Sequence, residues 1–424
     1  MAPNGHPDLR VRASFTLAAV SIAIVALTAG ACSAKKPSAA AKQANGSQSS
    51  SLATPSSSPS VEPAVLTVSE TGANKVSPAD PIKVNVAGGQ LVSVTMTSNE
   101  GKTVKGATSP DKTSWSTAED LGYSKTYTVS ATAKNADGVE TQKQSTFTTV
   151  TPGNMTMPYI QTAAGGAVAP GTTFGVGQVI RIHFDESIPN RKAAQDTLSV
   201  TTVPAQAGGF NWLSNTDVYW RGKTYLKPGT KVTIAAKVYG KDFGNSLYGQ
   251  ADTSTWYKVG PKHYSVADDN TKLVKVYTND KLVRTMPTSM GRHTSIAGDT
   301  GPIDLRTNSG PHVVIDSETN INMNSASFGL SKGANSYKTI VPIGVKISYD
   351  GEYVHWADWS IWAQGNTDTS HGCLNVSPSD AYWFASYSLP GDIVDVKNTG
   401  RPLELWNSGF WTASWAQWIK GSAK

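Results

Sequence analysis

The sequence predicts a mainly β protein made of several sandwich domains in a row. Its 424 residues are enough for two to four domains, and charged residues make up only 16% of them. Thr, Ser, Val, Gly and Tyr are frequent, a composition that favours strands over helical bundles. Several segments alternate apolar and polar residues between Gly, Asn and Asp turns, which is the pattern of half-buried strands.

The first 32 residues have the pattern of an export signal. Arg10 and Arg12 precede an apolar stretch over 13–29, and small residues lead to Cys32. This order is typical of a signal peptide, and a cysteine directly after small residues is typical of a lipobox. We therefore expect an exported lipoprotein, lipidated on Cys32 and held at the outer face of the cytoplasmic membrane. A plain signal peptide or N-terminal anchor is the alternative, because Ala29 stands where a lipobox usually has Leu.

Residues 33–63 are rich in Ser, Ala, Pro and Lys and hold almost no large apolar side chain. Such a segment cannot bury enough surface to order itself. We expect a flexible linker, which lets a membrane-anchored protein reach into the cell wall.

Two stretches of similar pattern follow the linker, over 64–151 and 152–262. In the first, Tyr127 and Val129 share one face of a strand, with Thr and Ser on the other. A constant spacing relates the two stretches, pairing Trp115 with Trp220, Leu121 with Leu226, Tyr127 with Val232 and Val129 with Ile234. The repeat predicts two immunoglobulin-like sandwiches without a disulfide. Their expected role is to space the third domain from the membrane, and wall binding is the alternative.

A third domain is expected over 263–398, built of short strands and one helix. Ser377 is a good N-cap, Pro378 suits the first turn, and Asp380 sits at the positive end of the helix. The helix should end before Pro390. The expected strands are Lys272–Tyr277, Lys281–Thr285, His312–Asp316, Val345–Tyr349, Tyr353–His355 and Ile393–Val396.

The third domain contains one cysteine, Cys373, in the run Thr369–Asn375. The only other cysteine in the chain is Cys32, so Cys373 has no obvious disulfide partner although the chain has an export signal. A cysteine attacks as a thiolate and needs a base. His355 ends an alternating run eighteen residues upstream, which suits a base on a strand facing a nucleophile on a loop. The N–H groups of Gly372 and Cys373 are candidates for an oxyanion hole.

The full motif resembles the signature of the L,D-transpeptidases with a YkuD-type (ErfK-type) catalytic domain. It consists of His355, fourteen intervening residues and the run Ser370–Asn375. The chain from about residue 64 is similar to envelope members with two immunoglobulin-like domains before the catalytic domain. Further resembling segments are 267–271, 286–291, 363–366 and 390–394.

The resemblance implies the reaction and the site residues. Cys373 matches the family nucleophile, which attacks the carbonyl between meso-diaminopimelate and D-Ala of a peptidoglycan stem, and His355 matches its base. A diaminopimelate amine of a second stem then resolves the thioester into a 3→3 crosslink. The resemblance assigns oxyanion or supporting roles to Gly372, His371, Ser370 and the backbone of Trp356. It assigns substrate binding to Tyr337, Asp350, Gly351 and Asn375.

The resemblance also implies ligands. The partners are a tetrapeptide donor stem, a diaminopimelate acceptor and carbapenem β-lactams as covalent inhibitors. No cofactor is expected. Some relatives hold calcium in a loop that corresponds to 241–246, but a hard cation prefers several carboxylates, and only Asp242 is charged there. Asp242, Asn245 and Ser246 are therefore weak candidates for a structural calcium site.

Two departures from the family pattern bear on specificity. Trp356 and Trp362 place bulky rings where relatives more often have smaller residues, which predicts a narrower pocket or a different choice of stems and β-lactams. The segment 299–302 also differs from the family's usual stretch.

Two alternatives to a crosslinking enzyme stay open. Water as acceptor would give an L,D-carboxypeptidase, and a wall-binding lipoprotein with an inactive catalytic domain is the non-enzymatic alternative. The intact motif argues against the inactive domain.

The chain ends in an aromatic segment and carries a mildly basic charge. Residues 399–424 contain four tryptophans and are expected to pack on the catalytic domain or its junction with the second sandwich. The net charge of +6 suits an anionic cell wall. Nucleic-acid binding is not expected, because Lys and Arg are dispersed and no basic run with aromatics occurs.

Overall fold

A computed structural model describes residues 62–423 of the chain. The expected signal segment, the lipidation site Cys32 and nearly all of the expected linker lie outside these residues. Among residues 62–423, no helix is both long and apolar enough to cross a bilayer. The described residues form β-sheets with few short helices, which confirms the predicted fold class.

The first sandwich encloses a core of alternating apolar residues. On β6, Val129 and Ala133 are fully buried while Thr126 and Lys134 face solvent. One sheet has the order β1 (Val65–Val68), β2 (Lys83–Ala87), β5 (Ser114–Thr117) and β4 (Gly106–Thr108). The other has the order β3 (Gln90–Ser98), β6 (Thr126–Lys134) and β7 (Glu140–Thr148).

The second sandwich has two four-stranded sheets and repeats a packing detail of the first. A Cβ on Gly106 would lie 2.0 Å from the Trp115 ring, and one on Gly208 would lie 2.1 Å from the Trp220 ring. The matched tryptophans therefore each lie against a glycine of the neighbouring strand. The first sheet contains β10 (Thr172–Phe174), β17 (Thr253–Val259), β15 (Lys231–Ala236) and β12 (Leu198–Val203). The second contains β13 (Gly208–Trp212), β14 (Asp217–Gly222), β11 (Ile180–Phe184) and β9 (Pro158–Thr162).

Smaller elements complete this sandwich. Strands β16 (Leu247–Gly249) and β8 (Asn154–Thr156) form a two-stranded parallel sheet. The short helix α1 (Arg191–Asp196) begins after Asn190, whose side chain accepts from the Ala193 N–H.

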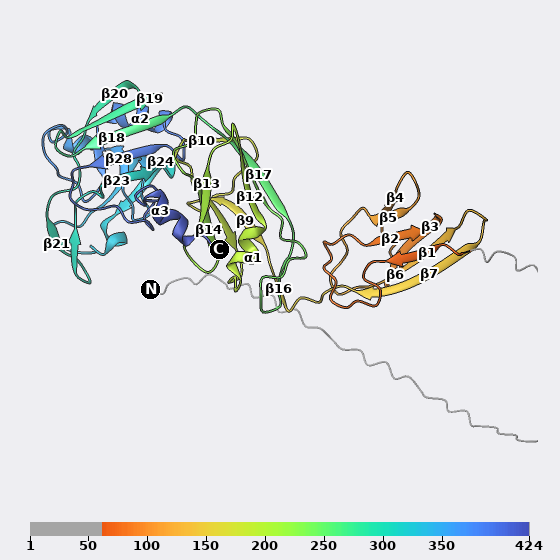
Figure 1. Ribbon diagram of the computed structural model, residues 1–424. Coiled ribbons are helices and arrows are strands. Elements are labelled where there is room, and N and C mark those ends of the chain that lie inside the picture. Colours follow the sequence, from red (N-terminus) through yellow and green to blue (C-terminus); the bar gives the residue numbers. More distant parts are fainter. Residues whose placement is uncertain (1–61, 424) are drawn as a thin grey trace, which may run out of the picture. The chain divides into compact units, whose positions relative to one another are not determined.

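The third domain packs two sheets and a helix around one core (Figure 1). One sheet has the order β20 (Lys281–Pro287), β19 (Leu273–Thr278), β18 (His263–Asp268), β28 (Ile393–Lys397) and β23 (Gly310–Val313). The other has the order β24 (Asp316–Asn324), β25 (Lys338–Lys346), β26 (Tyr353–Trp356) and β27 (Leu374–Val376). Three smaller elements connect these strands. The hairpin of β21 (Ser295–Ala297) and β22 (Pro302–Asp304) lies between β20 and β23 in the chain. The 3-10 turn η1 (Ser325–Phe328) lies between β24 and β25, and η2 (Asp358–Ser360) lies between β26 and β27.

The helix after the cysteine forms where the sequence predicts it. Helix α2 (Pro378–Tyr387) begins after Ser377, whose side chain accepts from the Asp380 N–H. Ala381 and Phe384 are buried in the core and the helix packs against β25 and β26.

Two of the predicted strands of this domain are wrong. The expected strand His312–Asp316 is the end of β23 and the start of β24, because the chain leaves one sheet after Val313 and enters the other at Asp316. The expected strand Val345–Tyr349 is the last part of the longer strand β25, which ends at Lys346. The sequence did not predict the β24–β25 hairpin, because β24 is rich in exposed polar residues and β25, with Pro342 and Gly344 among its apolar residues, lacks a regular apolar alternation.

The C-terminal segment packs beside both the second sandwich and the catalytic domain. Phe410 and Trp418 are buried with Val179, Val313 and Ile393. The indole N–H groups of Trp411 and Trp418 donate to the Gly177 and Gly209 carbonyls, each at 2.9 Å. Helix α3 (Trp415–Trp418) and the turn η3 (Ile419–Gly421) form the end of this segment.

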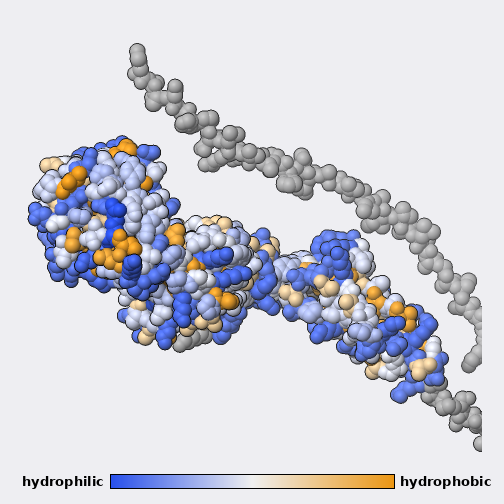
Figure 2. Space-filling model, turned by 90° about the horizontal axis from the view of Figure 1, so that it is seen from above, coloured by the Kyte–Doolittle hydropathy of each residue, from blue (hydrophilic) through white to orange (hydrophobic). Residues whose placement is uncertain are grey.

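The surface of the described residues is largely hydrophilic. Figure 2 shows small hydrophobic patches separated by polar residues. The most exposed large rings are Trp362, at 70%, and Trp406, at 65%.

Candidate active site

The parallel pair β26–β27 brings the predicted base and nucleophile together. Val354 pairs with Leu374 and His355 pairs with Asn375. Cys373 is therefore the last residue before β27 and lies beside the strand that carries His355. The pairing of these two strands brings residues eighteen positions apart in the sequence to the wall of one cavity.

His355 is held in the tautomer that a general base requires. Its Nδ1 lies 2.7 Å from the Trp356 carbonyl oxygen, and because a carbonyl can only accept, Nδ1 must carry the proton. Nε2 therefore keeps its lone pair. Burial lowers the pKa of His355 to about 4, against the opposing contacts with the Trp356 carbonyl and Asn375. The ring is neutral at pH 7.

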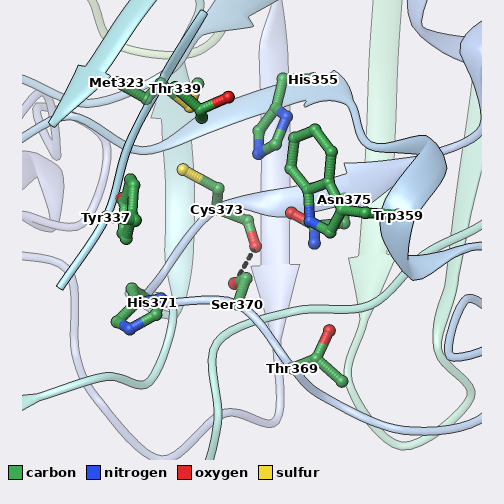
Figure 3. Close-up of a pocket in the computed structure, with 10 residues that line it drawn as sticks. All are labelled: Met323, Tyr337, Thr339, His355, Trp359, Thr369, Ser370, His371, Cys373 and Asn375. Carbon is green, nitrogen blue, oxygen red and sulfur yellow. Dashed lines mark hydrogen bonds between the residues drawn. The ribbon is translucent and has the colours of Figure 1, made fainter. Parts of the chain in front are cut away.

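Cys373 is a thiol in this structure and its sulfur is turned away from the base. Sγ lies 3.6 Å from the Gly351 carbonyl oxygen and donates to it. Figure 3 shows Sγ on the side of Tyr337, with the His355 ring beyond the other side of the cysteine side chain. Burial, with smaller contributions from Glu352 and Asp350, raises the pKa of the Cys373 thiol to about 12. Among residues 62–423 no hydrogen bond joins Cys373 to His355.

Ser370 fixes the loop that carries the nucleophile. Its hydroxyl donates to the Cys373 carbonyl at 2.6 Å and accepts from the Gly372 N–H at 3.1 Å. Gly372 has φ of 132°, which favours glycine, and its carbonyl accepts from Thr307 Oγ1 at 2.7 Å. The Gly372 N–H is thus occupied within the loop, and the Cys373 N–H is the oxyanion-hole candidate that remains.

His371 and Tyr337 form an aromatic wall on the sulfur side of the site. Their ring centroids are 5.1 Å apart, and Phe328 lies 6.2 Å from each of them. Arg292 Nη2 lies 3.0 Å from His371 Nε2 and must be the donor. Burial and this guanidinium lower the pKa of His371, and burial together with Cys373 raises the pKa of Tyr337. Both groups are neutral at pH 7.

Asn375 and Trp356 lie behind the base. Asn375 is 4% exposed and its Nδ2 donates to Ser360 Oγ at 3.0 Å. Its backbone N–H and carbonyl both bond to Ser289. The Trp356 side chain is half-buried and packs 5.7 Å from the Trp359 ring. Asn375, which the sequence suggested for substrate binding, is thus held by protein partners, although it still lines the cavity.

Two cavities meet at Cys373. The histidine-side cavity, of about 310 Å³, is drawn in Figure 3 and is lined by Met323, Tyr337, Thr339, His355, Trp359, Thr369, Ser370, His371, Cys373 and Asn375. The turn-side cavity, of about 600 Å³, shares Met323, Tyr337, His371 and Cys373 with it. Its other walls include Phe328, Asp350, Gly351, Tyr353, Arg401 and Trp406. Cys373 is therefore reachable from two sides.

Several lining residues carried no signal in the sequence. Met323, Phe328 and Thr339 reach the site from the β24–β25 hairpin and the turn between its strands, and that hairpin was not predicted. Trp359 comes from the short turn η2, between the two tryptophans that the sequence did single out. Trp362 is exposed and does not line either cavity.

The carboxylates that could act as metal ligands already have protein partners. In the loop 241–246, the Asp242 carboxylate accepts from the Gly244 N–H at 2.8 Å and from the Tyr248 hydroxyl at 3.2 Å. Among the described residues, Asp269, His293 and Asp368 also lie close together. The Lys272 ammonium contacts both of these carboxylates, so this cluster is an ion-pair network.

Models of two families match the chain over its described part. A bacterial Ig domain matches residues 73–242, and an L,D-transpeptidase catalytic domain of the YkuD type matches residues 262–396. L,D-transpeptidase 2 of Mycobacterium tuberculosis is 42% identical over 363 residues, which cover 85% of each chain. The chain belongs to the L,D-transpeptidase family.

One further relative agrees with this family, and a solved structure is similar over part of the chain. L,D-transpeptidase 5 of Mycobacterium tuberculosis is 32% identical over 361 residues, covering 82% of this chain and 74% of that protein. The solved structure of L,D-transpeptidase LdtMt1 in complex with imipenem is 24% identical, has a TM-score of 0.47, and covers 57% of this chain and 99% of that one.

The family settles the class of chemistry. This L,D-transpeptidase is a cysteine-dependent enzyme that acts on peptidoglycan. The resemblance on which the sequence prediction rested is confirmed.

Proposed function

We propose that this transpeptidase forms 3→3 crosslinks between diaminopimelate residues of peptidoglycan stems through a thioester on Cys373. The observation that supports this most is the position of one thiol between two cavities, because a two-substrate transfer needs room for a donor and an acceptor. The neutral His355 with a free Nε2 supplies the base.

The reaction begins with rotation of the Cys373 side chain from the Gly351 carbonyl toward His355 Nε2. The imidazole takes the thiol proton as sulfur attacks the donor carbonyl, and the Cys373 N–H donates to the oxyanion. The C–N bond to D-Ala then breaks, and the leaving amine takes the proton from His355. His355 next takes a proton from the acceptor amine as the amine attacks the thioester carbonyl. The C–S bond then breaks, and the departing sulfur takes the proton back from His355.

The turn-side and histidine-side cavities suit different parts of the substrates. Asp350 and Gly351 lie at the turn-side cavity, together with Arg401. Carboxylate and guanidinium groups at one entrance suit a zwitterionic diaminopimelate side chain, which carries both an amine and a carboxylate. The histidine-side cavity is lined mainly by apolar and hydroxyl groups and suits the uncharged peptide backbone at the scissile bond.

The test is incubation of the enzyme with a purified disaccharide-tetrapeptide, followed by mass spectrometry, with Cys373→Ala as control. A dimer lighter than two monomers by one D-Ala, absent in the control, is the expected product. Tripeptide monomer alone would instead indicate an L,D-carboxypeptidase. No product and no carbapenem adduct on Cys373 would leave the wall-binding alternative.

We also propose that carbapenems acylate Cys373, since the strained lactam carbonyl is an electrophile for the same thiolate. Intact-protein mass spectrometry should find a single adduct that Cys373→Ala abolishes. The ring of Trp359 lines the histidine-side cavity next to Trp356, and we propose that it contributes to the choice of β-lactam.

We further propose that the enzyme is exported and anchored through a lipidated Cys32, with the two sandwiches spacing the active site from the membrane. The support is the order of basic, apolar and small residues before Cys32. Mass spectrometry of the N-terminal peptide from membrane fractions should find acyl chains on Cys32. A processed peptide without lipid would favour a plain signal peptide.

A further inference from the structure

A buried carboxylate–imidazole pair lies directly behind the turn that receives the thiol. Glu352 follows Gly351 in that turn, and His312 lies on β23 of the other sheet. Their atoms Oε2 and Nε2 are 3.0 Å apart. Glu352 is 5% exposed and His312 is fully buried. The mechanism above uses neither of them.

The hydrogen bonds of this pair determine how many protons it holds. His312 Nδ1 lies 2.9 Å from the Gly310 carbonyl oxygen, so Nδ1 must carry a proton and donate. Nε2 then faces a carboxylate oxygen, and this contact needs one more proton. Either His312 is an imidazolium beside an ionised Glu352, or Glu352 is protonated and donates to neutral His312. The net charge of the pair is zero in both states.

The remaining contacts of Glu352 fix the turn in place. Glu352 Oε1 accepts from Asn308 N at 2.7 Å and from Asn308 Nδ2 at 3.0 Å. The Glu352 N–H donates to Ser348 Oγ at 2.8 Å. A Cβ placed on Gly372 would lie 3.7 Å from Glu352 Oε1, so the carboxylate abuts the loop of the nucleophile.

The position of Glu352 makes its charge relevant to the thiol. An unpaired carboxylate beside Cys373 opposes formation of the thiolate, as like charges do in a buried site. Besides Glu352, the titratable or charged groups that line the two cavities at Cys373 are His355, His371, Tyr337, Tyr349, Tyr353, Lys346, Arg401, Asp304 and Asp350, and Arg292 lies against His371. Of these, the acidic group on the same turn is Asp350, which is exposed to solvent.

We propose that His312 and Glu352 act as a positioning pair for the reaction of Cys373. By sharing one proton they hold the turn whose Gly351 carbonyl receives the thiol, and they cancel the charge of Glu352 next to the nucleophile. This inference rests on the proposed cysteine chemistry but names residues outside it.

The test measures the pH dependence of Cys373 alkylation by iodoacetamide, which does not require transpeptidase activity. Every variant of the full chain also carries Cys32→Ser, so that Cys373 is the only thiol. His312→Gln keeps a donor toward Glu352 but cannot carry a positive charge. Its alkylation profile should move to higher pH, and the rate at a fixed pH below the thiol pKa should fall about tenfold for each pKa unit.

The double variant Glu352→Gln/His312→Gln shows whether the shift in the alkylation profile comes from the charge of Glu352 or from altered packing. It removes the carboxylate charge together with the imidazole, so its profile should return to that of the parent and match that of Glu352→Gln alone. This comparison also works if His312→Gln alone does not fold, because a neutral Glu352→Gln partner leaves no buried charge.

A matched control is Asp392→Asn, which disrupts a similar buried pair in the same domain. Asp392 Oδ2 lies 3.0 Å from His263 Nδ1, and neither residue lines the cavities at Cys373. Its alkylation profile should stay that of the parent.

Three results would overturn the proposal. The first is an unchanged alkylation profile in His312→Gln, with only a lower melting temperature. The second is an alkylation profile of the double variant that stays at higher pH than that of the parent. The third is a shift of equal size in the profile of Asp392→Asn. If the variants show the expected alkylation profiles but the parent forms no crosslinks, the proposed function is contradicted and the role of the His312–Glu352 pair is not.

Discussion

The protonation states of the two proposed catalytic residues, Cys373 and His355, follow mainly from burial. With the thiol pKa near 12 and the imidazole pKa near 4, both groups are neutral between these values. The free enzyme therefore contains no thiolate–imidazolium pair. The Cys373 thiol proton has to move to His355 Nε2 as the sulfur attacks the substrate. Desolvation therefore lowers the thiolate fraction of Cys373, and with it the reactivity of the free enzyme.

This state predicts a steep pH dependence. Because the thiolate is a small minority below the thiol pKa, alkylation of Cys373 by iodoacetamide should rise about tenfold per pH unit from pH 6 to 9. The measurement is the alkylation rate in a Cys32→Ser background, with Cys373→Ser as the blank. A plateau that begins below pH 7 would indicate an ion pair instead.

The Ser370 hydroxyl holds the loop that carries Cys373 through two hydrogen bonds. Removing its hydroxyl leaves the Cys373 carbonyl and the Gly372 N–H without their partner. Ser370→Ala should lower the free energy of unfolding by about 1–3 kcal/mol, and it should slow carbapenem acylation of Cys373. Ser370→Thr, which keeps the hydroxyl, serves as the control. Thermal unfolding and acylation rates measure the two effects, and equal acylation in all three proteins would contradict the supporting role.

At the scale of elements, the strands and helix with strong local signals were predictable. Helix α2 was predicted because Ser377 and Pro378 give an unambiguous start, and β6 because its apolar residues alternate. The β24–β25 hairpin has no such pattern, because β24 is mostly polar and exposed and β25 has Pro342 and Gly344 among its apolar residues. Cys373 and His355 were found from their spacing, whereas Met323, Phe328 and Thr339 could not be, because only the hairpin's fold brings them to the thiol.

The hairpin should act on substrate binding more than on thiol chemistry. Tyr337→Ala removes a wall shared by both cavities, so acylation by a carbapenem should fall while alkylation by the small iodoacetamide changes little. Tyr337→Phe keeps the ring and should retain most of the acylation rate. Parallel rate measurements on the three proteins check this, and an equal loss in both reactions would mean that Tyr337 acts on the thiol itself.

At the scale of the described part of the chain, the second sandwich and the C-terminal segment are joined through a buried arginine. Arg221 is 2% exposed. Its guanidinium lies 4.5 Å from the ring centroid of Trp411, 4.7 Å from that of Trp418 and 5.7 Å from that of Trp415. Nη2 donates to the Ala413 carbonyl at 2.8 Å. Among the salt bridges of residues 62–423, none involves Arg221, and burial lowers its pKa to about 10.

The planar guanidinium explains why this site holds arginine. It stacks between aromatic faces while its edge still donates to a carbonyl, which a lysine ammonium cannot do. Arg221→Lys should therefore lower the free energy of unfolding by about 1–3 kcal/mol, and it should expose the C-terminal segment to proteolysis. The rate of Cys373 alkylation should stay the same, because Arg221 lies outside the site.

The matched control is Arg191→Lys, whose guanidinium lies 5.5 Å from the Trp212 ring centroid but is only half-buried. Exposed cation–π contacts contribute about 0.5–1 kcal/mol at most, so this variant should change the melting temperature little. Thermal unfolding and limited proteolysis of both variants, with intact mass analysis of the fragments, make the comparison. Equal effects of the two substitutions would mean that the tryptophan cage does not hold the C-terminal segment, and that its other contacts, such as the Trp418 bond to the Gly209 carbonyl, are sufficient.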